Sequence, residues 1–202
     1  EIPGHKIKLS QCNISKELAY AVNRLKRQGY QIDLFEISVI SPVYVVWCLI
    51  RNNHSNAKMF SYSAAGSGLV LSDAVSAALK EAVVGMSIYA NEQEEMPKVP
   101  KNIVTLEDHV RFYGNIANKN AFNFTNQFTN FVDDNRYLNL GSQNTSITKS
   151  EVINFIIEKL KKEFKDILIV NLTSDYLKKH DLYTVKAVIP GMFPMTFGDN
   201  SL

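Results

Sequence analysis

The sequence predicts an α/β or α+β fold in which helices pack on a mixed sheet, and three observations support this class. Apolar residues recur at helical spacing over residues 15–29, 72–91 and 150–164. Short apolar runs of strand length lie between these segments, so the two patterns alternate along the chain. The run 43–50, VYVVWCLI, is apolar on both faces and therefore predicts a central strand.

The stretch 60–93 organises the rest of the chain. It predicts a strand end, a loop of small residues at 64–68 and one long helix from Ser72 to about Asn91. Ser72 is a good N-cap, and Asp73 suits the positive end of the helix dipole. At about 1.5 Å per residue, this helix would be roughly 30 Å long. Its apolar residues cover most of its sides, so we expect it to be buried between layers.

Glu81 is the acidic residue in the middle of this helix, beside Lys80. A carboxylate on a mostly buried helix needs a cation, a metal or backbone donors, because moving an unpaired charge out of water is costly. This makes Glu81 the first candidate for a functional residue.

The composition divides the chain into three parts. We expect one lobe over 15–92, an exposed charged connection with two prolines over 93–104, and a second lobe over 105–202. The weakly periodic segment 117–143, rich in Asn, Phe and Thr, predicts a long loop with a short helical turn. The expected strands are short and lie at 31–38, 43–50, 59–63, 167–172 and 183–189.

Local signals mark the helix ends. Gly29 is a natural stop for the first helix. Thr105 and Asp108 have capping-box spacing, which predicts the start of a helix. Thr148 and Glu151 have the same spacing at the start of the last long helix.

Charge and cysteine content exclude several classes of protein. A formal net charge of +2 over 202 residues is too small to indicate nucleic acid or an acidic membrane as the partner. Cys12 and Cys48 have no metal-type spacing and do not make a disulfide framework, so we expect a reducing cytoplasm. The N-terminus has no signal-peptide pattern and no initiator Met, and we expect a processed or truncated chain.

The familiar catalytic spacings are missing from the sequence. It contains no GxSxG, HExxH or CxxC motif, and the segment 66–68 lacks the lysine of a P-loop. Spacing alone therefore predicts an α/β domain without a defined activity. The histidines are scattered, which favours surface or capping roles for all four: His5, His54, His109 and His180.

Three segments carry a family resemblance. Residues 64–83, AAGSGLVLSDAVSAALKEAV, resemble a glycine-containing loop followed by AL-x-RAL-x-EA. Residues 183–198, YTVKAVIPGMFPMTFG, resemble V-x-x-V-x-VPG-x-x-P-x-x-FG, and LEDHVRFYGN at 106–115 resembles D-H-x-x-x-Y. These patterns occur in the same order in the YcaO-domain family. The resemblance covers most of this chain but only the later half of a YcaO domain, so we expect a fragment of a longer protein.

The resemblance implies an enzyme that uses ATP and Mg²⁺ to act on peptide backbone amides. The best-known members are cyclodehydratases of thiazole and oxazole biosynthesis in ribosomal peptide natural products such as bacteriocins. There a Cys, Ser or Thr of the substrate attacks the preceding carbonyl, ATP phosphorylates the resulting oxygen, and phosphate leaves to give an azoline. The resemblance thus implies a precursor peptide as substrate and an E1-like or leader-peptide-binding subunit as partner. From the small net charge we expect no nucleic acid and no membrane as partners.

Within this resemblance, Glu81 falls on the family's helix glutamate, which lies near the nucleotide and its metal. Glu81 is therefore the candidate for binding ATP or Mg²⁺, directly or through another ligand. The alternative is a structural pair with a buried arginine. The sequence departs from the family after this residue, because Val84 and Met86 stand where many members have Gln and Arg. The resemblance assigns no catalytic residue.

Two functions from different classes follow. The first is the later half of a YcaO cyclodehydratase, which we expect to be inactive alone because the earlier half of the domain carries most of the ATP- and magnesium-binding carboxylates. The second is a non-catalytic YcaO-like scaffold that holds a peptide or a partner. A methionine at 86 cannot replace the charge-assisted bonds of an arginine to phosphate, so we expect either weak nucleotide binding or a divergent branch of the family that anchors the phosphates elsewhere.

Overall fold

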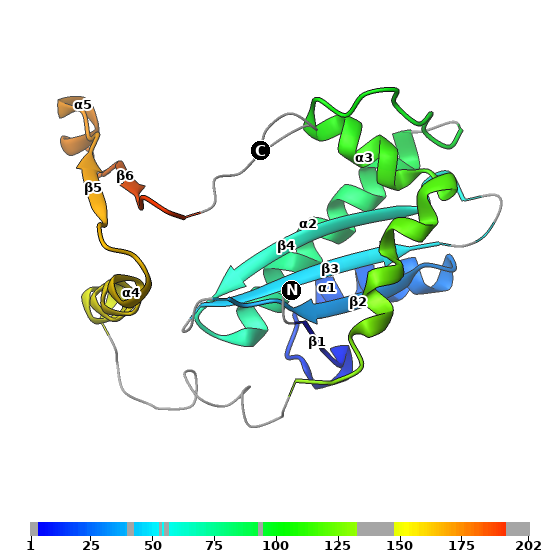
Figure 1. Cartoon of the computed structure of the whole chain (residues 1–202), viewed down its shortest axis with the longest axis horizontal. Coiled ribbons are helices and arrows are strands. Elements are labelled where there is room, and N and C mark those ends of the chain that lie inside the picture. The colour runs from blue at the N-terminus through cyan, green and yellow to red at the C-terminus, as the bar shows by residue number, and fades with distance from the viewer. Residues whose placement is uncertain are drawn as a thin grey trace. The chain divides into compact units, whose positions relative to one another are not determined.

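The structure, a computed structural model, describes residues 4–39, 43–52, 54, 57–92, 95–132 and 148–192 (Figure 1). The chain forms two compact units, one of residues 1–144 with 196–202 and the other of residues 145–195. The expected connection over 93–104 and the start of the second expected lobe at residue 105 both fall inside the first unit.

The first unit is built on a four-stranded sheet with the strand order β1-β2-β3-β4. The strands pair antiparallel, so that Phe35 lies opposite Trp47 and Trp47 opposite Ala65. One isolated parallel bridge joins Lys6 to Phe131. The predicted class, helices packed on a sheet, is confirmed. The strands are β1 His5–Lys6, β2 Gln31–Glu36, β3 Tyr44–Arg51 and β4 Ser61–Gly68.

Both faces of this sheet are covered, as the two-sided apolar pattern of 43–50 predicts. One face packs on α1 Lys16–Arg27 and α2 Leu71–Glu92, which lie behind the sheet in Figure 1. The other face meets η2 Ile116–Gln127, in front, where Phe122 packs in one cluster with Leu49. The central strand is thus confirmed. Three residues of β3 have no exposed surface on the α1–α2 face: Val46, Cys48 and Ile50.

The helix α1 begins and ends where the sequence predicts, after a short 3₁₀ turn, η1 Leu9–Gln11. Ser15 Oγ accepts a hydrogen bond from the Leu18 N–H at 3.2 Å. Gly29 follows the helix with φ of +88°, a conformation that glycine adopts readily. The His54 ring lies over this glycine, because an added Cβ would lie 2.7 Å from the ring.

The small residues at 64–68 form the end of β4 rather than the expected loop. Gly66 explains the difference, because an added Cβ would lie 2.6 Å from the Ala74 carbonyl oxygen and would overlap the Ala78 backbone nitrogen. The strand therefore needs small residues so that α2 can cross it at backbone distance. The loop prediction was wrong because turns and close backbone approach select the same residue types.

The helix α2 is buried along one side only, and the expectation that most of its sides are covered was wrong. Ala78 and Ala82 have no exposed surface, whereas Val84 and Ile88 are 51% and 46% exposed. The helix begins at Leu71, one residue before the expected cap. Neither α2 nor any other helix of the described ranges is long and apolar enough to cross a membrane.

The helix α3 Leu106–Gly114 follows the predicted capping box. Thr105 Oγ1 accepts from the Asp108 N–H at 3.2 Å, and Asp108 Oδ2 accepts from the Thr105 N–H at 2.8 Å. The end of the helix is tied to β4, because Ser61 Oγ donates to the Tyr113 carbonyl oxygen at 2.6 Å. This contact holds α3 beside the edge strand of the sheet.

The 3₁₀ segment η2 is longer than the short helical turn expected within 117–143. The Asn115 side chain accepts from the Ala117 N–H at 2.8 Å and so caps its start. The buried Phe122 ring lies 6.3 Å from the Phe60 ring, which anchors η2 on the sheet. Residues 133–143 of that prediction lie outside the described residues.

The second unit contains the long helix and the two strands predicted after residue 148, with a short helix between the strands. Its first helix carries the predicted capping box, in which the Thr148 N–H donates to Glu151 Oε2 at 2.7 Å. The two strands pair antiparallel. Residues 193–198 of the family-like segment lie outside the described residues. The elements are α4 Lys149–Glu163, β5 Leu168–Asn171, α5 Asp175–Lys178 and β6 Val185–Val188.

The contact at Gly66 can be tested by adding one methyl group. Gly66→Ala should lower the free energy of unfolding by about 3 kcal/mol, the upper part of the usual range for an overpacked core, because the neighbouring atoms are backbone and cannot rotate away. Urea unfolding measures this value. Ser67→Ala, at the next and exposed position, is the control and should change it by less than about 0.5 kcal/mol. Equal stability of the two variants would contradict the backbone contact.

Candidate functional site

A groove of about 790 Å³ lies on the exposed side of α2. The helix contributes one face, because Ala77, Glu81, Val84 and Ile88 follow each other at helical spacing. β4 and α3 supply the remaining wall. We call this the Glu81 groove, and its lining residues are Tyr62, Ala77, Lys80, Glu81, Val84, Gly85, Ile88, Tyr89 and Glu107.

The Glu81 side chain is exposed and lines this groove. Among the residues that the structure describes, it has no ion pair and no hydrogen bond through its side chain. The alternative of a structural pair with a buried arginine is therefore wrong for this part of the chain. An exposed carboxylate without a partner is accessible to an incoming cation.

Tyr62 reaches the groove from β4 and lies across α2 at Gly85, where an added Cβ would overlap the ring. Its ring centroid is 5.7 Å from that of Tyr89. Burial raises the pKa of Tyr62, and the nearby Tyr89 and the charge of Glu81 raise it further. The phenol is therefore neutral near pH 7, and its O–H can donate a hydrogen bond.

Glu107 brings a second carboxylate to the groove, and no sequence motif marks it as a site residue. It lies in the first turn of α3, where Arg111 Nη2 approaches its Oε1 to 2.5 Å. Acidic residues are common in the first turn of a helix, beside a capping box. The residue type and position of Glu107 therefore do not mark it in the sequence as a site residue. The LEDHVRFYGN segment around it did carry part of the family resemblance.

The two departures from the family pattern lie in different places. Val84 lines the groove and is 51% exposed, so an apolar side chain stands where the family has an amide. Met86 is fully buried in the core on the other side of the helix. Only Val84 therefore changes the chemistry of the groove in this structure.

Other candidate groups do not form a site in the described residues. No set of three or more His, Cys, Asp or Glu residues within them could hold a metal ion. Burial raises the pKa of Cys12 to about 11 and also raises that of Cys48, so both are thiols rather than reactive thiolates. The histidines lie apart, each with its own neighbour: His5 with Glu36, His54 with Gly29, His109 with Tyr113 and His180 with Tyr176.

The effect of Glu81 on Tyr62 gives a test of the groove. Glu81→Gln removes one of the charges that raise the pKa of Tyr62, so this pKa should fall toward its ordinary value of about 10. It should stay above that value, because burial is the largest cause. NMR titration of ¹³C-labelled tyrosine measures it, with Glu158→Gln on α4 as the control. Identical values in the two variants would place the Glu81 carboxylate away from Tyr62.

The fold is similar to solved structures of much larger proteins. One is YcaO from Methanopyrus kandleri bound with AMPPCP and Mg²⁺, at 15% identity and a TM-score of 0.59, with 94% of this chain and 45% of that one covered. Another is the heterocyclase TruD, at 12% identity and a TM-score of 0.54, where the match covers 95% of this chain and 24% of that one. A third is a heterocyclase in complex with substrate and cofactor, at 10% identity and a TM-score of 0.57, where the match covers 95% of this chain and 24% of that one.

The chain thus spans less than half the length of these proteins, and identities this low establish the fold alone. No curated protein matches the sequence. A family model described as YcaO cyclodehydratase, ATP- and Mg²⁺-binding, matches residues 2–193. Because this match covers nearly the whole sequence and the fold agrees with it, the chain belongs to the YcaO family.

Proposed function

We propose that this chain is the later portion of a YcaO-type enzyme that uses ATP and Mg²⁺ to activate peptide backbone amides. The observation that supports this most is Glu81, an exposed carboxylate on the helix that carries the family pattern. The proposed reaction converts Cys, Ser or Thr of a precursor peptide into azoline heterocycles of a ribosomal peptide natural product. Further carboxylates for the metal would come from the earlier half of the domain.

The donor groups of the Glu81 groove suit a magnesium–nucleotide complex. Mg²⁺ is usually held by one or two carboxylates, with water and phosphate oxygens completing its shell. Glu81 and Glu107 supply two carboxylates on one groove, and Lys80 beside them can bind a phosphate as a point charge. The neutral phenol of Tyr62 adds a hydrogen-bond donor.

The role of this chain is to hold the nucleotide and its metal and to orient the reacting groups. When bound, ATP supplies the phosphoryl group that turns the amide oxygen into a leaving group, while Mg²⁺ offsets the phosphate charge. Glu81 and Glu107 would hold the cation, and Lys80 and Tyr62 would donate to anionic oxygens. The substrate provides the nucleophile, so the chain needs only to position the reacting groups.

The proposed partners follow from this reaction. The substrate is a precursor peptide, and an E1-like or leader-peptide-binding subunit would present it. We place the reaction in the cytoplasm, in keeping with Cys12 and Cys48, which are free thiols.

A non-catalytic scaffold is the second candidate, and Val84 favours it. Its apolar side chain is 51% exposed in the groove and cannot bond a phosphate. A scaffold would bind the peptide without turning over ATP. Peptide-dependent ATP hydrolysis by the full-length protein separates the two functions.

Glu81→Gln should reduce peptide-dependent ATP hydrolysis by about ten-fold or more, the usual range for loss of a group that supports a metal site. The melting temperature should stay the same, because Glu81 is exposed and has no ion pair within the described residues. Both quantities are measured on one preparation of the full-length protein.

The matched control is Glu158→Gln, which removes an exposed carboxylate of α4 outside the groove and should leave the rate unchanged. An unchanged rate in Glu81→Gln would remove Glu81 from the site. A large fall in the melting temperature would instead give it a structural role.

A further inference from the structure

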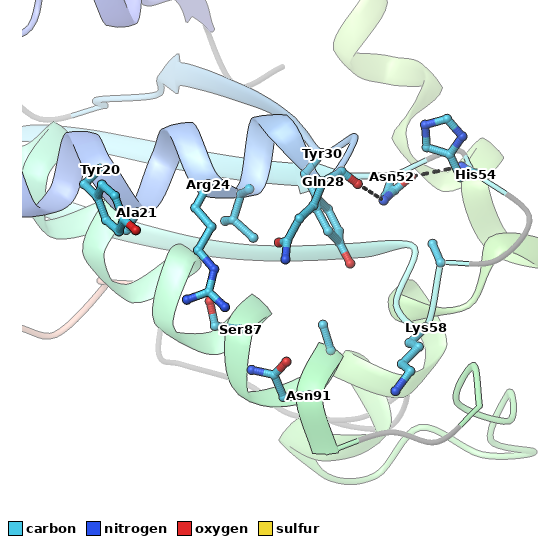
Figure 2. Close-up of a pocket in the computed structure, with 13 residues that line it drawn as sticks. Tyr20, Ala21, Arg24, Gln28, Tyr30, Asn52, His54, Lys58, Ser87 and Asn91 are labelled. Carbon is cyan, nitrogen blue, oxygen red and sulfur yellow. Dashed lines mark hydrogen bonds between the residues drawn. The ribbon is translucent and has the colours of Figure 1, made fainter.

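A second cavity, of about 460 Å³, lies between α1, α2 and the chain that connects β3 to β4 (Figure 2). It shares no lining residue with the Glu81 groove, because it uses Ser87 and Asn91 on another face of α2. Its volume falls within the range of roughly 300–1,000 Å³ that small-molecule sites occupy. It is therefore large enough for a ligand and separate from the proposed nucleotide site.

The charged groups at this cavity are cationic. Arg24 comes from the last turn of α1 and Lys58 from the β3–β4 connection, and both side chains are exposed. Neither has an ion pair in the part of the chain that the structure describes, and no Asp or Glu of that part lines the cavity. Figure 2 shows Arg24 and Lys58 on different walls with the opening between them, so each can attract an anionic group that enters the cavity.

Neutral donors surround the same space. Figure 2 shows Arg24, Tyr30, Lys58 and Asn91 around one opening. Tyr30 is only 9% exposed, and burial raises its pKa, so its phenol keeps the proton that it can donate. The Asn91 amide and the Ser87 hydroxyl are further donors. An oxygen-rich anion can therefore be bonded from several sides.

The wall on the side of the connection is fixed by a buried asparagine. Asn52 is 4% exposed, and its Nδ2 donates to the Gln28 carbonyl oxygen at 3.3 Å. Its Oδ1 accepts from the His54 N–H at 3.0 Å. These bonds join the end of α1 to the start of the connection that carries Lys58.

The helix dipoles disfavour an anion in this cavity. Their size relative to the charged side chains decides the sign of the electrostatic potential there. The C-terminal turns of α1 and α2 lie at the cavity, and a helix C-terminus carries the equivalent of about half a negative charge. Arg24 and Lys58 carry two full positive charges, which exceed both dipoles together. The cavity therefore keeps a positive potential.

We propose that this cavity binds the oxyanion of a small molecule, either a phosphate ester or a carboxylate. Arg24 and Lys58 pair with the anion, and Tyr30 and Asn91 donate to its oxygens. The site is independent of ATP turnover at the Glu81 groove, so binding alone reports on it.

Isothermal titration of the purified protein with inorganic phosphate, and separately with citrate, tests this proposal. Saturable binding of either probe is expected, and the probe that binds distinguishes a phosphate from a carboxylate ligand. Arg24→Gln and Lys58→Gln should each weaken binding by about ten-fold, as for the loss of one charge-assisted hydrogen bond. Tyr30→Phe, which removes only the hydroxyl, should weaken it less and in the same direction.

The matched control is Arg27→Gln, an exposed cation in the same last turn that does not line the cavity. It should bind as the unmodified protein does. Thermal unfolding of each variant confirms that it is folded. The proposal is overturned if neither probe binds saturably, or if Arg27→Gln weakens binding as much as Arg24→Gln, since that result would indicate general surface charge.

Discussion

The backbone contact between α2 and β4 at Gly66 sets where the groove residues of α2 lie relative to the sheet. No side chain separates the two elements at this point, so the helix crosses the strand at the shortest possible distance. Gly85 repeats the device on the helix, where it makes room for the Tyr62 ring. The groove on one side of α2 and the cavity on another both depend on this placement of the helix.

Most of the fold could be predicted because it depends on local signals and on the period of the apolar residues. The two-sided pattern of 43–50 identified the central strand, and Thr105 and Thr148 marked helix starts that the structure confirms. The segment 64–68 could not be predicted correctly, because its small residues serve a contact with a helix that lies later in the sequence. The exposed side of α2 was missed for a related reason: Val84 and Ile88 count as apolar wherever they face.

The candidate site could be predicted only in part. Glu81 was singled out by the family pattern of its helix and by an expected burial that the structure contradicts, because its side chain is exposed. Tyr62 and Glu107 join it only because β4 and α3 pack beside that helix. The second cavity gave no sequence signal at all, since Arg24 is an ordinary basic residue of a last turn and Lys58 lies in a connection. Sites assembled from several elements need the topology before their residues can be recognised.

The pair of Arg111 and Glu107 gives the Glu81 groove an internal counter-ion. Two carboxylates on one groove repel each other, and the guanidinium reduces that repulsion by neutralising one of them. The side chains of Arg111 and Glu107 are 50% and 57% exposed, so their pair is worth only about 0.3–0.5 kcal/mol. A pair this weak would cost little to open if, as proposed, a divalent cation took the place of the arginine at Glu107.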